Sequence, residues 1–407
     1  YRAYAAPKLN QLYRARQPLE VVYVSHIDQD HISGVLQLLD DLLEWRVHEY
    51  QRQHGNPRRA APEFPRPPEI KKVWHNAFHE SVGKNAGAIA DMLAAKAAVF
   101  AGVDIPKSLR DAVEEHANLA TSVQEAMGVS RRIHPEQLNI ALNPEYGKRL
   151  MLVLERPPDL RLGSVSIRVI GPFEEDLKNL RAEWNEWLGK NQKALADIRR
   201  RAGRDAERLT ASEVGRLVDP LVASALGLRD FEAEQLALAA RQLGRREKVT
   251  TPNLASLMLL LEENGKTVVL TGDGHWQDIL AGLEQAGALD ASGKAHFDVL
   301  KVQHHGSEHN IHQDFCDAVT ADHYIFCGNG AHQNPDLEVL ELIAGRRFQG
   351  DSKAFRFWFN SSSAASEEPP KAAHMKKVEK LTQKLVTQSG GRLKTNFLKE
   401  SFFEFSV

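Results

Sequence analysis

The sequence is poor in the features that mark secreted, membrane and nucleic-acid-coating proteins. Its 407 residues include two cysteines, Cys316 and Cys327, which excludes a disulfide framework and favours a reducing compartment. No apolar run approaches the ~18 residues needed to cross a bilayer. The 52 Lys and Arg residues nearly balance the 54 Asp and Glu residues, for a formal net charge of −2. This balance argues neither for nor against nucleic acid, and any such contact would need a local patch.

A leader segment is also missing from the start of the sequence. The first residue is Tyr1, and no charged, apolar and small-residue leader follows it. We therefore expect a cytoplasmic protein whose N-terminus is trimmed or processed. Hydrophobic residues make up 42% of the chain, enough for a large core. The length predicts two or three domains, or one domain with large insertions.

The most informative segment is His26-Ile27-Asp28-Gln29-Asp30-His31. It follows a short apolar run at 21–24 and precedes a segment in which a helix could begin. Four side chains that can bind a metal therefore leave the end of a predicted strand within one turn. Imidazole together with carboxylate suits Zn²⁺, Mn²⁺ or Fe²⁺. A plain loop with an Asp helix cap needs one such residue, so we interpret the segment as half of a metal site.

Three further clusters each follow a predicted strand. Asp273 lies in Thr271-Gly272-Asp273-Gly274-His275, and His304 and His305 open the segment His304-His305-Gly306-Ser307. His332 lies in a Gly- and Asn-rich loop after the strand at 324–327. Each cluster alone could be a polar turn or surface. Recurrence after successive strands is what a metal site at one edge of a sheet requires, so together they predict its second half.

The remaining pattern alternates between strands and helices. We predict helices over 32–52, 86–130 and 173–246, and a late helix through Val378, Leu381 and Leu385. Prolines make 55–68 a loop, and composition makes 361–372 a linker. The predicted strands are 21–25, 72–74, Leu150–Leu154, Val165–Ile170, Leu257–Leu261, Thr267–Leu270, Phe297–Val302, Tyr324–Cys327 and Phe402–Phe405.

In combination, these motifs resemble those of metallo-β-lactamase-fold hydrolases. The nearest likeness is to the branch that includes the metallo-β-lactamase-like domains of bacterial DNA-uptake (competence) channel proteins. That branch has HxDxDH, matched by His26, Asp28, Asp30 and His31, and a TGD turn, matched at 271–273. It also has an LKV-x-HHGS segment and an N-x-x-S element, matched by 300–307 and by Asn253 with Ser256. The resemblance covers about 20–105 and 250–345.

The resemblance implies an α/β fold, an αββα sandwich, with a large helical insertion. The opening β-hairpin of that fold has no counterpart before residue 20, so its strands are missing from this chain or the first half-sheet is incomplete. We expect the first half of the core at 1–105 and a mainly helical insertion, with strands near 150 and 165, at 106–249. The second half of the core follows at 250–360, and 361–407 forms a linker, a helix and a final strand.

The resemblance also implies roles for the site residues. His26 and Asp28 would hold one ion, Asp30, His31 and His305 the other, and Asp273 would bridge the two. Asp30 could also orient the attacking water, and His304 would face the substrate as a hydrogen-bond donor or general acid. Either His304 or His305 could be the ligand. Asn253 stands near the position of a usual histidine ligand, so the first site is weak, prefers Mn²⁺ or is completed by another residue such as His75.

These residues predict a hydrolase with two divalent ions, Zn²⁺ or Mn²⁺, acting on phosphodiesters such as DNA, RNA or a smaller molecule. An amide, ester or lactone hydrolase is an alternative, as is a metal-stabilised interaction module without turnover. The insertion could dock a protein partner, and no membrane is implied. A basic group before His75 could follow a nucleic-acid backbone or serve solubility alone. It comprises Arg58, Arg59, Arg66, Lys71 and Lys72.

Overall fold

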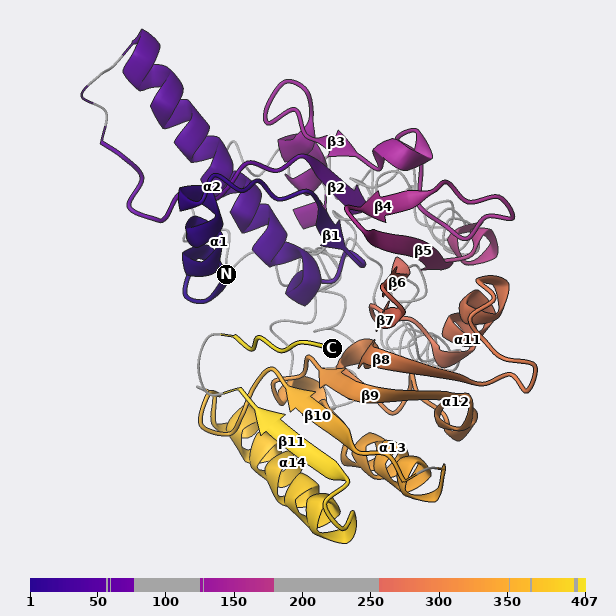
Figure 1. Cartoon of the computed structure of the whole chain (residues 1–407). Helices are drawn as coiled ribbons and strands as arrows, with labels where there is room; N and C mark the ends of the chain where they lie inside the picture. The colour runs from indigo at the N-terminus through magenta and orange to yellow at the C-terminus, as the bar shows by residue number, and fades with distance from the viewer. Residues whose placement is uncertain are drawn as a thin grey trace, which may run out of the picture.

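The computed structural model describes residues 1–55, 58, 60–76, 125–126, 128–178, 256–350, 352–366, 368–398 and 402–407. These residues form a mixed α/β fold with two sheets (Figure 1). The smaller sheet has the order β1-β2-β3, with bounds Val22–Val24, Lys72–His75 and Ala141–Leu142. The larger sheet has the order β11-β10-β9-β8-β7-β6-β5-β4. Its strands are Leu393–Phe397, Phe355–Phe359, Val319–Phe326, Ala295–Lys301, Lys266–Leu270, Met258–Glu263, Val165–Gly171 and Leu160–Leu162.

Strand direction decides where the loops of the larger sheet meet. β7 to β11 run parallel to one another, whereas β4, β5 and β6 join through antiparallel pairs. The loops after β7, β8 and β9 therefore leave the same edge of the sheet. β1 and β2 are also parallel, with Val24 opposite His75. The motif at 26–31 therefore begins just beyond the end of β1, next to the end of β2.

Three clusters of buried side chains lie between the layers. The residues of β6 and the one before it contribute to two of these clusters, because alternate residues of an extended chain point to opposite faces. Leu257, just before β6, and Leu259 pack with Trp74 of β2 in a cluster between the two sheets. Met258 and Leu260 enter the largest cluster, which lies between the larger sheet and its helices. A third cluster lies between the smaller sheet and the N-terminal helices. The larger sheet is therefore covered on both faces, as the uninterrupted apolar run of β6 requires.

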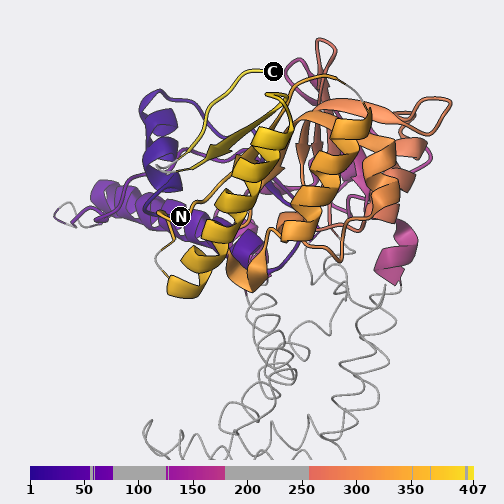
Figure 2. The same cartoon turned by 90° about the horizontal axis from the view of Figure 1, so that it is seen from below.

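Helices cover the outer faces of both sheets. On the larger sheet, the four helices gather on one face (Figure 2). They are α11 (Trp276–Gln285), α12 (Gln313–Ala318), α13 (Leu337–Gly350) and α14 (Pro369–Gln388). On the smaller sheet, α1 (Ala5–Arg14) and α2 (Gln29–His54) contribute to the N-terminal cluster. Short 3₁₀ helices occupy Pro144–Tyr146 (η2), Gln303–Gly306 (η3) and Ala331–Gln333 (η4). Within the described residues, no helix is both long enough and apolar enough to cross a bilayer.

Two predicted strands are wrong. Leu150–Leu154 is extended but forms no ladder, because the Asn76 amide takes both backbone groups of Met151, and the Val153 N–H donates to the Pro172 carbonyl. The strand at that edge is β4 instead. Phe402–Phe405 is also not a strand: Phe405 stacks on Trp358, with ring centroids 4.5 Å apart. Its alternating aromatic pattern reflects side-chain packing. β10 and β11 were not predicted.

The predicted boundaries also need correction. β4 and β5, which we assigned to the insertion, pair with β6 and belong to the larger sheet. The predicted linker is too long, because α14 begins at Pro369, and proline is favoured in a first helical turn. The C-terminal segment then adds β11 to the same sheet as the predicted second half of the core. The helices predicted over 86–130 and 173–246 lie mostly outside the described residues.

Candidate metal centre

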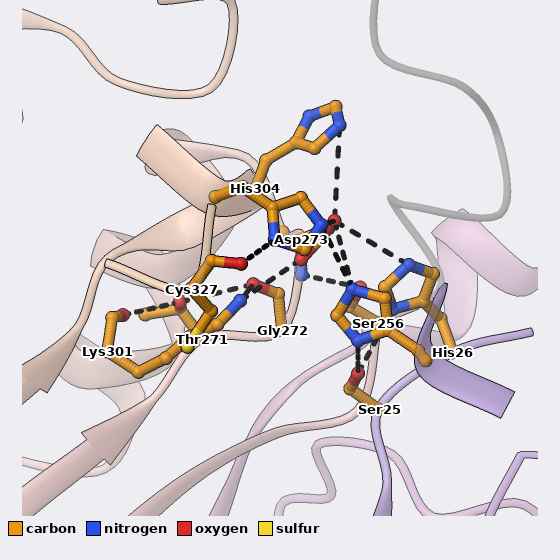
Figure 3. A network of polar contacts seen from close by, with 12 residues as sticks. Ser25, His26, Ser256, Thr271, Gly272, Asp273, Lys301, His304 and Cys327 are labelled. Carbon is orange, nitrogen blue, oxygen red and sulfur yellow. Dashed lines mark hydrogen bonds and ion pairs between the residues drawn. The ribbon is translucent and has the colours of Figure 1, made fainter. Parts of the chain in front are cut away.

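Four imidazoles surround one carboxylate oxygen (Figure 3). Measured from Asp273 Oδ2, the Nε2 atom of His305 lies at 3.2 Å and that of His31 at 3.4 Å. The Nε2 atoms of His26 and His304 lie at 3.7 and 3.9 Å from the same oxygen. These residues come from three loops, which follow β1, β7 and β8. The structure therefore brings the residues of the predicted motifs together around Asp273, as we expected.

The first loop places its ligands at the start of a helix. α2 begins at Gln29, so Asp30 and His31 lie in its first turn, where the helix dipole favours a carboxylate. Asp28 occupies the N-cap position but makes no side-chain capping bond. Its Oδ2 lies 3.6 Å from His26 Nε2 instead. The capping interpretation of this aspartate therefore does not hold, and its carboxylate faces the other ligands.

The TGD turn depends on the glycine between its threonine and aspartate. Gly272 has φ +53°, and an added Cβ would lie 2.9 Å from the Ser256 side chain and 3.1 Å from that of Ser25. Only glycine satisfies both conditions without strain. The Asp273 N–H donates to Ser256 Oγ at 3.1 Å, which gives the serine of the N-x-x-S element a role. Asn253 of that element lies outside the described residues.

Lys301 fixes the orientation of the Asp273 carboxylate. Its Nζ donates to Asp273 Oδ1 at 3.1 Å and also to the Gly272 carbonyl. The lysine therefore occupies one carboxylate oxygen and leaves the other to the imidazoles. Asp273 is 2% exposed. Burial acts to raise the pKa of this carboxyl, but the charges of Lys301 and His26 outweigh it and hold the pKa well below the ordinary value.

His304 and His305 have left-handed backbone conformations, with φ values of 45° and 57°. Such conformations are costly for residues other than glycine and cluster at functional sites. The turn directs both rings toward Asp273 and gives each Nδ1 an oxygen partner. His304 Nδ1 lies 2.6 Å from Asn310 Oδ1, and His305 Nδ1 lies 3.1 Å from the Cys327 carbonyl oxygen. His305 Nε2 also lies 2.9 Å from Asp30 Oδ2.

The hydrogen-bond partners assign the tautomer of these two rings. Asn310 donates its amide to the Asp273 and Gly274 carbonyls, so its Oδ1 is the end that faces His304. Because that oxygen can only accept, His304 Nδ1 carries the hydrogen and Nε2 presents a lone pair to the centre. The Cys327 carbonyl likewise accepts a hydrogen bond from His305 Nδ1, so Nε2 is the nitrogen of His305 that faces the centre. Metal-binding imidazoles are held in this way, with one nitrogen bonded to an oxygen and the other free for the ion.

The pKa values follow from the same contacts. Burial lowers the pKa of His304 more than the nearby Asp273 raises it, so His304 stays neutral at pH 7. Burial also acts to lower the pKa of His305, but its contacts with Asp273 and Asp30 outweigh this and raise the value to about 10. In the protein without a bound ion, His305 is therefore protonated and supplies the positive charge between Asp30 and Asp273. A divalent ion would replace that charge.

Among the described residues, two groups of three side chains have ligand atoms within 4.8 Å of one another. The first comprises His26, His31 and Asp273, and the second comprises Asp30, His31 and His305. The second group agrees with the ligands that the resemblance implied for one ion, and it places His305 among them. Asp28 and His304 belong to neither group and lie at the margin of the centre. An unpaired buried atom also fits a metal, because His26 Nε2 is buried without a hydrogen-bond partner.

The other predicted histidines lie outside these groups. His332 is exposed on η4. His75 is fully buried at the end of β2, and neither of its ring nitrogens has a hydrogen-bond partner. Burial and the neighbouring His26 lower its pKa to about 4. Among the described residues, no three-ligand group includes His75, so the structure gives no support to its completing the first site.

Three members of the predicted basic group form ion pairs. Arg66 pairs with Glu49 and Glu69, Lys71 with Glu20, and Lys72 with Glu145. For these three residues, the contacts favour a role in solubility and local structure over contact with nucleic acid, and Arg59 lies outside the described residues. Sequence reasoning missed the orienting groups around the centre, namely Ser25, Lys301, Asn310 and the Cys327 carbonyl. Ser25 precedes the first motif directly and Lys301 lies within the LKV-x-HHGS segment, but their roles were not predicted, and no sequence pattern marked Asn310 or Cys327.

No protein-family model matches this chain, and no curated protein matches its sequence.

Proposed function

We propose that the protein is a metal-dependent hydrolase of the metallo-β-lactamase fold that acts on phosphodiesters. One observation carries the proposal: the four imidazole Nε2 atoms lie within 3.9 Å of Asp273 Oδ2, and each Nδ1 of these rings has an oxygen partner. Every ring thus bonds an outer oxygen through Nδ1 and turns Nε2 toward one shared centre, which is how metal-binding imidazoles are held.

The layering of the fold supports the αββα part of the proposal. Buried clusters lie, in order, between α2 and the smaller sheet, between the two sheets, and between the larger sheet and α11 to α14. This gives helices outside and sheets inside. The candidate centre lies where loops of both sheets meet. A hydrogen bond from the Leu257 N–H to the Ser25 carbonyl (2.7 Å) links the two sheets beside it.

The residues divide into holders and reacting groups. His26, His31, His305, Asp30 and Asp273 would hold two divalent ions, with Asp28 beside the first. Bound ions of this kind supply Lewis acidity and lower the pKa of a water molecule. Asp30 has an exposed carboxylate, so it can orient a water molecule by accepting a hydrogen bond from it. The lowered pKa of His304 means that its ring binds a proton weakly, so Nε2 can accept a proton and then release it.

Charge and ligand type favour an anionic substrate and a hard ion. Three carboxylates and one lysine surround the centre, so two divalent ions would leave it positive and attract a phosphodiester. Carboxylate oxygen from Asp28, Asp30 and Asp273 suits Mn²⁺ better than an all-imidazole site would. We therefore expect greater activity with Mn²⁺ than with Zn²⁺.

An activity panel tests the proposal. The protein would be loaded with Mn²⁺ or Zn²⁺ and assayed on a chromogenic phosphodiester, single- and double-stranded DNA, RNA, an aryl ester, a lactone and a β-lactam. The control is Asp30→Asn, which keeps the size of the side chain but removes its charge. We expect turnover of at least one phosphodiester and its loss in Asp30→Asn. Turnover of the ester, lactone or β-lactam alone would contradict the substrate proposal, and no turnover of any compound would contradict the enzyme proposal.

A further inference from the structure

A single hydroxyl group contacts two of the four imidazoles. Ser25 Oγ lies 3.1 Å from His26 Nδ1 and 3.2 Å from His31 Nδ1 (Figure 3). Ser25 is buried, with 7% of its surface exposed, and it immediately precedes the first motif. By contrast, His304 and His305 each have an oxygen partner of their own. Ser25 is thus the one point through which both histidines of the first loop are held.

The backbone and surroundings leave Ser25 little freedom. Its carbonyl accepts the Leu257 N–H at 2.7 Å across the two sheets. Its Cβ faces Gly272, where even one added carbon would lie 3.1 Å away. The backbone and Cβ of Ser25 are therefore held in place beside the TGD turn. A rigid acceptor in this place fixes the direction of both rings, and with it the position of both Nε2 atoms.

The donor inventory gives the hydroxyl a second effect. A serine oxygen can accept two hydrogen bonds and donate one. When Ser25 accepts from both rings, each Nδ1 carries hydrogen and each Nε2 has a lone pair for an ion. When it donates to one ring, that ring holds its hydrogen on Nε2 and cannot bind. One hydroxyl therefore governs the tautomer of His26 and His31 together.

We propose that Ser25 is a positioning residue that sets the orientation and tautomer of both histidines, so that its loss weakens two ligands at once. This inference rests on the proposed metal centre. Groups that orient one metal-binding histidine are typically worth roughly 10- to 100-fold in metal affinity. We expect Ser25→Ala to lose at least that much, and Ser25→Thr, which keeps the hydroxyl, to retain the affinity of the wild type.

The experiment measures Co²⁺ binding by the absorption spectrum of the bound ion and by competition with a chelator. The matched control is Ser389→Ala, since Ser389 is also buried and hydrogen-bonded but lies at the end of α14. Thermal unfolding of the metal-free variants confirms that each is folded. We expect Ser25→Ala alone to shift the visible bands and weaken Co²⁺ binding. If Ser25→Thr does not fold, the comparison of Ser25→Ala with Ser389→Ala still decides whether the hydroxyl is needed.

The outcomes separate this inference from the proposed function. Wild-type affinity and bands in Ser25→Ala would overturn the role of Ser25 while leaving the metal centre intact. Equal weakening in Ser25→Ala and Ser25→Thr would also overturn it, because the loss would then follow packing instead of the hydroxyl. Failure of the wild-type protein to bind Co²⁺ would overturn the proposed function itself.

Discussion

The two ends of β8 carry the same residue types in different arrangements. At the start of the strand, His296 places Nδ1 2.9 Å from Thr320 Oγ1 and Nε2 3.1 Å from Asp322 Oδ1. Beyond its other end, His304 and His305 each bond Nδ1 to an oxygen outside the centre and direct Nε2 toward Asp273. Both regions contain histidine beside aspartate. Only the second directs several imidazole nitrogens at one common point.

A metal centre is therefore recognised by the convergence of its imidazole nitrogens on one carboxylate. The two nitrogens of His296 bond two separate neighbours, so this ring shares no centre with another histidine. His75 represents a third condition, since it is buried with neither nitrogen bonded. Its environment excludes charge, so it is suited to staying neutral and not to pairing with a carboxylate. The predictions below compare these three kinds of histidine environment.

The largest effect is expected from Asp273→Asn. Asparagine keeps an oxygen for Lys301 but removes the charge on which four imidazoles converge. We expect turnover to fall by well over the roughly 100-fold that an orienting group contributes, because the change removes a ligand of the centre itself. Initial rates with Mn²⁺-loaded protein measure this. A variant with more than a tenth of the wild-type rate would show that the convergence is not catalytic.

Asp30→Ala should also remove turnover, with little change in stability. The Asp30 side chain is 60% exposed, so its loss leaves no cavity. It does remove an ion pair with His305, so we expect the free energy of unfolding to fall by no more than about 1 kcal/mol, the usual range for an exposed ion pair. Activity and urea unfolding, both measured on the same preparation, test the two halves of the prediction. A strongly destabilised variant would mean that Asp30 serves the fold.

His75 should make the metal-free protein sensitive to acid. The folded-state pKa of about 4 is below the ordinary 6.5, so the unfolded chain binds more protons between these values. The free energy of unfolding therefore falls as pH drops from about 6.5 to 4, by about 3 kcal/mol. Urea unfolding across this range should show a shallower slope for His75→Gln than for the wild type. Equal slopes would show that His75 is charged in the folded protein.

The smallest effect is expected at the other end of β8. His296→Ala removes a side chain whose two nitrogens are already bonded at the surface, so bound metal and turnover should stay at wild-type levels. Metal analysis after desalting provides the measurement. A loss of metal in this variant would mean that satisfied histidines also take part, and the comparison between the two ends would fail.

The sequence predicted the contiguous parts of this site better than the dispersed ones. His26, Asp28, Asp30 and His31 lie within six residues, so their proximity follows from chain connectivity. The meeting with Asp273 and His305 was predicted from the repeated order of strand and loop, which parallel strands convert into a common edge. Most central strands were also predicted, because their apolar runs are long.

The rest depended on contacts that leave no local pattern. Asn310 orients His304 only because a turn brings it back to the centre, and the Cys327 carbonyl acts through its backbone. β11 was missed because its sequence, Leu-Lys-Thr-Asn-Phe, contains polar residues that an edge strand tolerates. The strand predicted at Leu150–Leu154 is wrong because the Asn76 side-chain amide takes both backbone hydrogen bonds of Met151, a contact that the local sequence does not signal.

Diffraction from crystals soaked in Mn²⁺, with data collected at a wavelength where manganese scatters anomalously, shows whether the four imidazoles hold an ion. We expect anomalous peaks beside Asp273 Oδ2, within about 2.0–2.3 Å of imidazole Nε2 atoms. His296 and Asp322 provide the internal control in the same crystal, and no peak is expected there. Clear density for the four imidazoles with no anomalous peak among them would mean that this cluster is not a metal centre.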